Sequence, residues 1–333
     1  MSDARGQGLK WRPSWSTLSR VGPLVGLAVV ALIFMAIQGG ELPDFASLQT
    51  VAVHAVIVAI AGIGMTIVIL SGGIDLSVGS ALAFSCIISA MASRAGWPLP
   101  AVILAGCAAG LACGFYNGLL IAVLRLPPFI VTLGTLGFFR GIAKWVSHSR
   151  VVTAPTQGLE TLVSPKPPHP AFVFAPGAWI MLLIAAFASL VLHRTVWGRR
   201  VTAIGSNPVA ADYAGIHIGR MKVQVYAACG LLVGFAGVLQ FGRLTVGDPT
   251  IAVGLELDAV AAAVIGGASL SGGSGSVFGA VCGAIMMAYL RNRCAALEWP
   301  NYVQEIIVGH IILLAVGLDF ARRSFLANSG RRA

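Results

Sequence analysis

The sequence contains few charged residues: Asp, Glu, Lys and Arg make up only 10% of its 333 residues, against roughly a quarter in ordinary soluble domains. Hydrophobic residues make up 57%, and the mean hydropathy is +0.87. This shortage of charge excludes a soluble globular enzyme, a disordered chain and a nucleic-acid-binding module. The formal charge of +10 does not indicate nucleic-acid binding, because the basic residues lie in short loops between long apolar runs.

Patterns that carry catalysis or metal binding are also missing. No Gly-Lys dipeptide occurs, so the chain has no P-loop for the phosphates of a nucleotide. The six cysteines show neither CxxC nor Cys/His ligand spacing, and we interpret them as free small hydrophobes. No Ser/His/Asp set and no pair of carboxylates converges plausibly on a reaction. We therefore expect no catalytic residue, metal or cofactor, and if ATP energises the protein, another subunit must bind it.

Long runs without charge predict an all-α, polytopic membrane protein with about ten transmembrane helices. About 20 apolar residues cross a bilayer as one helix. The predicted spans cover residues 21–40, 45–74, 76–93, 95–124, 129–147, 171–193, 223–242, two whole or broken spans within 259–290, and 302–318. The count depends most on the glycine-rich stretches, because glycine interrupts helices.

The distribution of Lys and Arg predicts the orientation. Fourteen lie in the N-terminal lead (1–20), at Arg125, in the loop 194–222 and in the basic tail (321–333), and six lie in the opposite loops. Basic residues concentrate on the cytoplasmic side, so both termini are predicted to be cytoplasmic. The transmembrane domain then covers residues 21–320, with the proline-rich loop 148–172 outside. The first apolar run is interpreted as an uncleaved helix, because no clear cleavage site follows it.

A nine-residue segment occurs twice in the chain. GGIDLSVGS at residues 72–80 and GGASLSGGS at residues 266–274 match at six of nine positions. Paired glycine-interrupted spans often mark the substrate path of a transporter, since unwound backbone at membrane depth needs protein or a water cavity around it. Two tight turns between adjacent spans are the alternative. The predicted topology places both copies of the segment on the cytoplasmic side, as in a parallel repeat. An inverted repeat would need a different number of spans.

Three charged residues lie within or between the predicted spans. Asp75 must face protein, water or a helix N-terminus, and its place before a predicted helix favours capping over direct contact with substrate. Arg140 and Lys144 are four residues apart and share one helix face. They either line a pathway, or Lys144 extends to the outer surface.

The cytoplasmic loop 194–222 contains a short predicted helix. Asn207 and Pro208 begin this helix and Gly215 ends it. The small side chains of Ala210 and Ala211 would let it lie in a groove of a partner. We interpret it as a docking element, with a simple connector as the alternative.

Several stretches in combination resemble the ribose-type sugar permeases of bacterial ABC importers. They are GMT at 64–66, SGGIDLSVG at 71–79, NG at 117–118, PFIVTLGT at 128–135, GR at 198–199, AIGSN at 203–207, and IGGASL at 265–270 with GG at 272–273 and GS at 275–276. The resemblance covers roughly residues 45–320. Importer permeases more widely carry a Glu-Ala-Ala-x-x-x-Gly docking loop. Here Val209 replaces the Glu, a departure that agrees with this branch.

The resemblance implies a multi-pass protein of the bacterial inner membrane, in contact with membrane lipid, that forms the path for a sugar or sugar-like solute. It implies a homodimer or a pairing with a similar permease, together with a cytoplasmic ABC ATPase and a periplasmic solute-binding protein, and no nucleic acid. The implied path residues are Gly72, Gly73, Asp75, Ser77, Asn117, Phe129, Thr132, Thr135, Gly266 and Gly267. The implied ATPase-coupling residues are Gly205, Asn207, Ala210, Ala211 and Gly215.

Other readings of the same residues stay open. The transported sugar is undetermined, because selectivity in such importers lies largely with the binding protein. An ion- or proton-coupled secondary transporter is the first alternative, and the lack of an acidic relay argues weakly against it. A membrane-embedded enzyme is the second, and the lack of a convergent catalytic set argues more strongly against it.

Overall fold

The computed structural model of the protein describes residues 15–40, 42–167 and 173–330. The first part of the N-terminal lead, the last five residues of the loop 148–172 and the last three residues of the basic tail lie outside the described residues. The described chain is almost entirely helical. Two short strands, β1 (Val152–Thr153) and β2 (Val246–Gly247), pair antiparallel, with Val152 opposite Gly247.

Thirteen helices follow one another in the described chain. They are α1 (Trp15–Ile37), α2 (Phe45–Leu70), α3 (Val78–Arg94), α4 (Leu99–Leu124), α5 (Pro128–Val146), α6 (Leu159–Leu162), α7 (Pro176–Arg194), α8 (Val196–Ser206), α9 (Pro208–Tyr213), α10 (Ile218–Leu244), α11 (Leu255–Ile265), α12 (Val277–Ala296) and α13 (Asn301–Gly330). Among the described residues, α2, α4, α5, α7 and α10 are long and apolar enough to cross a membrane, and α1, α3 and α13 contain shorter apolar stretches. The predicted all-α, polytopic membrane fold is confirmed.

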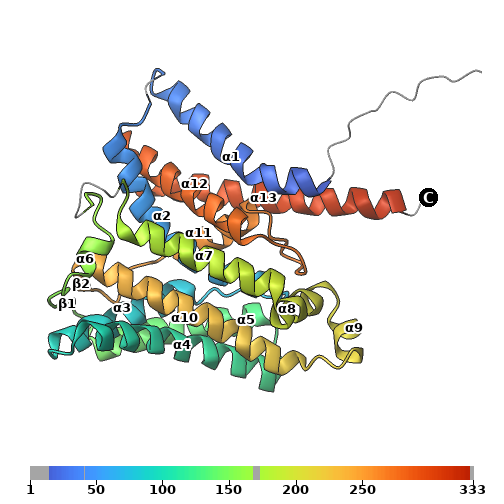
Figure 1. Ribbon diagram of the computed structural model, residues 1–333, viewed down its shortest axis with the longest axis horizontal. Coiled ribbons are helices and arrows are strands. Elements are labelled where there is room, and N and C mark those ends of the chain that lie inside the picture. Colours follow the sequence, from blue (N-terminus) through green and yellow to red (C-terminus); the bar gives the residue numbers. More distant parts are fainter. Residues whose placement is uncertain (1–14, 41, 168–172, 331–333) are drawn as a thin grey trace, which may run out of the picture.

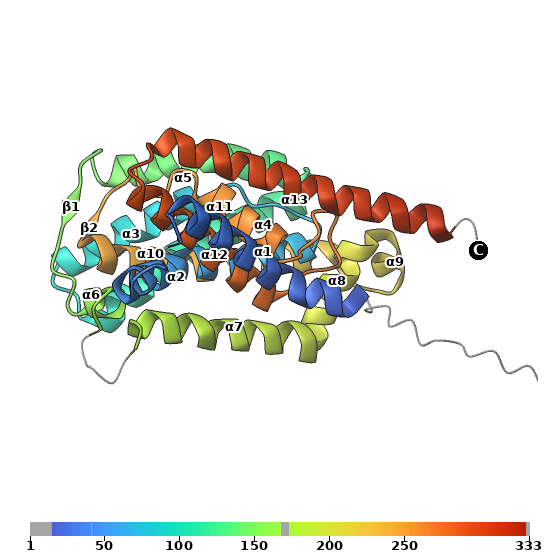
Figure 2. The same cartoon turned by 90° about the horizontal axis from the view of Figure 1, so that it is seen from above.

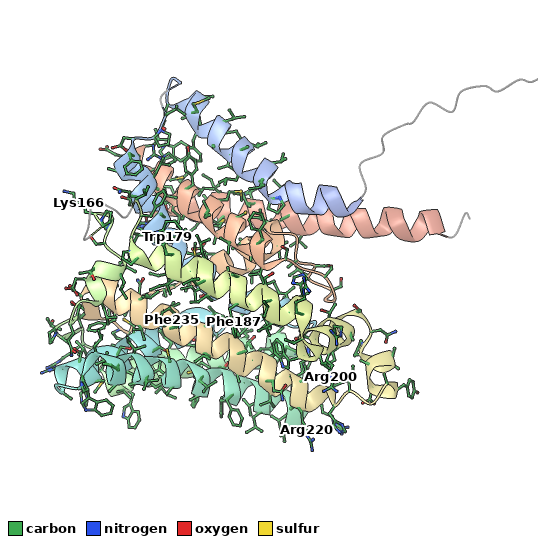
Figure 3. All side chains as sticks on the ribbon, viewed as in Figure 1. Lys166, Trp179, Phe187, Arg200, Arg220 and Phe235 are labelled. Carbon is green, nitrogen blue, oxygen red and sulfur yellow. The ribbon has the colours of Figure 1, made fainter. Side chains whose placement is uncertain are left out.

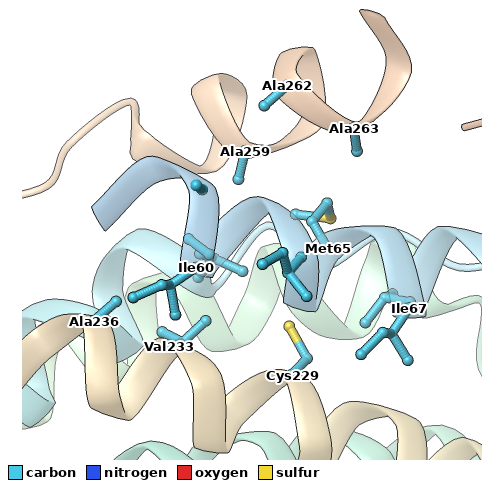
Figure 4. Close-up of a cluster of buried hydrophobic side chains, with 14 of the residues drawn as sticks. Ile60, Met65, Ile67, Cys229, Val233, Ala236, Ala259, Ala262 and Ala263 are labelled. Carbon is cyan, nitrogen blue, oxygen red and sulfur yellow. The ribbon is translucent and has the colours of Figure 1, made fainter. Parts of the chain in front are cut away.

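Helix α2 forms the centre of the molecule. It begins at Asp44, whose Oδ1 accepts a hydrogen bond from the Ser47 N–H (3.1 Å), and the hydrogen bonds from Ser47 lower the pKa of this carboxyl. Its 26 residues contain no charge, and nearly all of its apolar core segment is buried. Figure 4 shows α2 between α10, which contributes Val233, and α11, which contributes Ala262. A helix that is apolar on every side is covered by protein or by lipid, and for α2 the cover is the neighbouring helices.

Helices α4 and α10 cross so closely that backbone meets backbone. Glycine occupies every fourth position along α4, at Gly106, Gly110, Gly114 and Gly118. A Cβ atom added at Gly114 would lie 2.1 Å from the carbonyl oxygen of Tyr226, and one at Gly110 would lie 2.4 Å from that of Gly230. Small residues at four-residue spacing let membrane helices approach and gain van der Waals contact. This spacing is visible in the sequence and could have been used to predict the contact.

The stretch 259–290 contains parts of two helices, α11 and α12, joined by residues 266–276. The Arg291 guanidinium binds both carboxylate oxygens of Asp258, at 3.0 Å from Nε and 2.8 Å from Nη2. This ion pair was not predicted from the sequence. A buried carboxylate such as that of Asp258 requires a cation with well-aligned hydrogen bonds, and Arg291 supplies it. The ion pair holds the first turn of α11 and the last turns of α12 together.

The cytoplasmic and outer segments predicted from the sequence lie at opposite ends of the molecule. In Figures 1 and 2, α8, α9 and the C-terminal end of α13 lie at one end, and α6, β1 and β2 lie at the other. Helix α13 continues as far as Gly330, beyond the predicted end of the last span at 318, so the basic tail begins inside this helix.

Candidate functional site

The two glycine-rich segments that echo each other in the sequence meet in space. The first links α2 to α3, and the second links α11 to α12. The N–H of Gly273 donates a hydrogen bond to the carbonyl oxygen of Leu70 (3.0 Å). A Cβ added at Gly272 would lie 2.9 Å from the Cα of Gly72. The structure therefore brings both interruptions to one place.

Glycine is required at this contact by backbone conformation as well as by space. Gly72, Gly272 and Gly273 have φ angles of +76°, +87° and +74°. This left-handed region is accessible to glycine at little cost and is unfavourable for residues with a Cβ atom. The chain can therefore leave one helix and turn back within a few residues.

The end of α8 packs against both interruptions at the place where they meet. A Cβ at Gly205 would lie 1.8 Å from the carbonyl oxygen of Leu70 and 2.6 Å from the nitrogen of Gly273. We call this meeting point, formed by Leu70, Gly72, Gly205, Gly272 and Gly273, the glycine junction. Gly205 was predicted as an ATPase-coupling residue, and it is buried against the membrane domain.

Asp75 belongs to a buried polar network beside the glycine junction. Its side chain is 3% exposed, and its Oδ1 accepts hydrogen bonds from the N–H (2.9 Å) and the hydroxyl (2.6 Å) of Ser77. Asn117 of α4 donates from Nδ2 to the Ser77 hydroxyl (2.8 Å). Asp75 is not itself the N-cap residue of α3: Ser77 occupies that position and makes no side-chain cap hydrogen bond, and Asp75 accepts from the N–H of Ser77, directly before the helix. Asp75 instead holds the residue that begins the helix.

Side chains from α5 and α10 hold the carbonyl groups of the first interruption. Thr132 donates to the Ile74 carbonyl (3.1 Å), and so does the Tyr226 hydroxyl (3.4 Å). The Lys222 amine donates to the carbonyl (2.5 Å) and the hydroxyl (3.3 Å) of Ser71. Irregular backbone beneath a membrane surface needs such partners, because its carbonyl groups have none within a helix. Tyr226 and Lys222 were not predicted, although a Lys near the start of an apolar helix was a usable signal.

The remaining predicted path residues lie in different surroundings. Thr135 is buried, whereas Phe129 at the start of α5 is 51% exposed. Gly266 packs directly on Gly279 of α12, where a Cβ would meet backbone at 2.3 Å, and Gly267 is exposed.

Arg140 is tied to the outer loop before α11. Its Nη1 donates to the carbonyl groups of Pro249 (2.9 Å) and Ile251 (2.6 Å), while Lys144 is exposed. Arg140 therefore positions this loop, and its fixed hydrogen bonds distinguish it from the exposed Lys144.

The predicted cytoplasmic helix is α9, which follows α8 directly. Asn207 begins it, since its Oδ1 accepts from the Ala210 N–H (3.0 Å), and Gly215 follows its end with φ +80°. Both predicted ends are confirmed. Ala211, predicted as a coupling residue, is buried against the rest of this chain. The outer face of α9 instead presents Tyr213, which is 90% exposed.

We expect Asp75→Ala to lower folded yield and Asp75→Asn to be milder. Alanine leaves the buried N–H and hydroxyl of Ser77 without their acceptor, and each unmade buried hydrogen bond costs about 1–3 kcal/mol. Asparagine keeps an oxygen at the Oδ1 position and removes a buried charge that forms no salt bridge in the described chain. The measurement is the melting temperature of each purified variant together with its level in the membrane. Wild-type stability of Asp75→Ala would contradict this role.

The fold and the glycine junction define a polytopic membrane transport subunit. A family model described as "Branched-chain amino acid transport system / permease component" matches residues 47–316, so the chain belongs to this permease family. The ribose import permease of Escherichia coli (strain K12) is 36% identical over 87% of this chain and 92% of its own length.

Two further relatives cover most of the chain. The ribose import permease of Bacillus subtilis (strain 168) is 37% identical over 91% of this chain and 93% of its own length. The fructose import permease of Rhizobium meliloti is 33% identical over 89% and 84%. No solved structure gives a significant match.

Proposed function

We propose that the chain is the membrane subunit of an ABC importer and forms the translocation path for a monosaccharide or a similar solute. The cargo class is supported by the relatives, which are named for ribose, fructose, L-arabinose and xylose. A cytoplasmic ATPase supplies the energy, a periplasmic binding protein delivers the solute, and a second permease subunit completes the path.

The observation that carries this proposal is the contact of α8 with the glycine junction. One end of this segment continues into α9, which exposes Val209 and Tyr213. The same end places Gly205 directly against Leu70 and Gly273. A force applied to α9 from the cytoplasm is therefore transmitted to both interrupted helices without passing through a flexible linker. Such an arrangement suits a protein whose energy source is another subunit.

The orientation follows from which segments share an end of the molecule. In Figure 3, Arg200 and Arg220 lie at the end that holds α8 and α9, and Lys166 lies at the opposite end. We place the first end in the cytoplasm, where basic residues concentrate. The helix order then gives ten crossings, with α11 and α12 as two of them and both termini cytoplasmic.

The exposed and buried residues of the first interruption have different roles in this proposal. Phe129 and Gly72 are exposed and can meet a solute or the second permease subunit. Asp75, Ser77 and Asn117 are buried within the single chain, so they shape the path from behind.

Uptake into proteoliposomes tests the function. The purified permease is reconstituted with its cognate ATPase and binding protein, and uptake of labelled ribose, fructose, arabinose, xylose and leucine is measured with and without ATP. We expect ATP-dependent uptake of at least one monosaccharide, no uptake of leucine, and no ATP hydrolysis by the permease alone. Uptake driven by an imposed ion gradient without ATP would instead support a secondary transporter.

Cysteine cross-linking tests α9 as the docking element. We expect Val209→Cys and Tyr213→Cys to cross-link to surface cysteines of the ATPase in an active complex, because both side chains are exposed. Ala211→Cys is the matched control, since this residue lies on the same helix but is buried. Efficient cross-linking from another cytoplasmic segment, with none from residues 207–215, would show that the ATPase docks elsewhere.

A further inference from the structure

A cavity of about 1010 Å³ opens at the end of the molecule that holds α8 and α9. Three parts of the chain form its walls: the corner between α4 and α5, the segment from α8 to the start of α10, and the glycine junction. Its lining includes Arg125, Asp212, His217, Arg220 and Lys222. A volume of this size accommodates a small organic ligand.

The charge of the lining is predominantly positive. Arg125, Arg220 and Lys222 carry three positive charges, and Asp212 is the one acidic residue of the lining. Within the described chain, none of the three cations forms a salt bridge, and the Lys222 amine binds only uncharged oxygens of Ser71. Three cations against the single carboxylate of Asp212 leave the lining with excess positive charge, and an anion in the cavity would offset it.

The backbone around the cavity adds N–H donors, which favour an anionic ligand just as the cationic side chains do. His217, Ile218, Gly219 and Arg220 line the cavity, and they precede and begin the 27-residue helix α10. The first N–H groups of a helix have no partner within it, and the helix dipole favours negative charge at that end. A phosphate group is well matched to this combination of free N–H groups and Arg and Lys side chains.

We propose that this cavity binds a small molecule through a phosphate group on the cytoplasmic side of the membrane. A sugar phosphate and the headgroup of an anionic lipid share this chemistry. A sugar phosphate would be made by phosphoryl transfer to a sugar inside the cell. Because Ser71, Gly72, Gly205 and Ser271 also line the cavity, the bound ligand contacts the glycine junction. The site goes beyond the proposed function, since binding requires neither the ATPase nor a particular cargo.

Calorimetry on the full-length permease in phosphatidylcholine nanodiscs tests the site with ribose 5-phosphate as the probe. We expect saturable binding that weakens with added salt and is not displaced by ribose. The double variant Arg125→Gln/Arg220→Gln should weaken binding by at least about tenfold, since it removes two charge-assisted contacts to the phosphate. Both residues are exposed, so folding should be unaffected. Arg199→Gln/Arg200→Gln is the matched control: it removes two exposed arginines of α8 that do not line the cavity.

A second arm distinguishes the two sources of phosphate. If the site takes soluble ligands, ribose 5-phosphate should bind equally well in nanodiscs that contain phosphatidylglycerol and in nanodiscs of phosphatidylcholine alone. If this lipid blocks the probe, and Arg125→Gln/Arg220→Gln retains less of it than the control, the phosphate comes from lipid and the site is still supported. The proposal is overturned if neither probe binds, or if the control variant weakens binding equally. If neither probe binds and the cavity variant weakens only assembly with the ATPase, the cavity is a protein-docking groove and not a phosphate site.

Discussion

Gly114→Val is expected to lower the yield of folded protein severely. The added side chain starts 2.1 Å from the carbonyl oxygen of Tyr226 and 2.9 Å from the Cα of Gly230, and both are backbone atoms that cannot rotate away. Helices α4 and α10 would have to separate along a contact where glycine also faces backbone at Gly110. Overpacking a tight interface costs up to about 3 kcal/mol and occasionally more. That corresponds to roughly a hundredfold shift in the folding equilibrium.

The measurement is the yield of monodisperse protein by size-exclusion chromatography after extraction from the membrane. Gly141→Val is the matched control, because Gly141 also lies in an apolar helix but has no atom within 4 Å of its added Cβ. We expect near-normal yield from this control. Normal yield and melting temperature for Gly114→Val would show that the crossing tolerates side chains, and that the close packing of α4 on α10 is not essential.

Gly205→Ala is expected to leave the membrane fold intact and to lower ATP-driven uptake by at least about tenfold. A Cβ 1.8 Å from the carbonyl oxygen of Leu70 is far inside the 3.0 Å below which real Cβ contacts are essentially not seen. Helix α8 must therefore withdraw by about 1 Å, and it loses its packing against both interruptions. Packed contacts switch between discrete arrangements rather than stretch, so even a shift of this size separates the cytoplasmic segment from the path.

Uptake and ATP hydrolysis are measured together on the reconstituted complex. We expect hydrolysis to continue while uptake falls, provided that the ATPase still docks on α9. Gly219→Ala is the control: Gly219 is a glycine of the same cytoplasmic end, and its added Cβ would make only an ordinary contact with Ala122 (3.5 Å). Wild-type uptake by Gly205→Ala at normal membrane levels would show that the glycine junction does not couple ATP hydrolysis to transport.

The boundaries of most helices could be predicted from the sequence because they depend on local features. Asn207 accepts from the Ala210 N–H within the next turn, and Gly215 supplies the left-handed residue after α9. These contacts join residues that are close along the chain. The role of Asp75 was not predictable in the same way, since the network also includes Asn117, 40 residues away on α4.

Burial decided which predicted residues face outwards, and burial depends on the tertiary structure. Ala210 and Ala211 are equivalent small residues in the sequence, yet one is exposed and the other is buried. Tyr213 on the same helix is 90% exposed, but nothing local distinguishes an exposed tyrosine from a packed one. Gly205 looked like part of a surface loop until the fold placed Leu70 and Gly273 against it.

The sequence by itself determined that this protein is an all-helical membrane permease. With so few charges and such long apolar runs, the backbone must satisfy its hydrogen bonds within helices, because lipid offers none. Only the tertiary structure decided that the two glycine segments meet, that α8 packs against both of them, and that Arg125, Arg220 and Lys222 line one cavity. These contacts join residues far apart in the chain, and their formation depends on how whole helices pack rather than on any local preference.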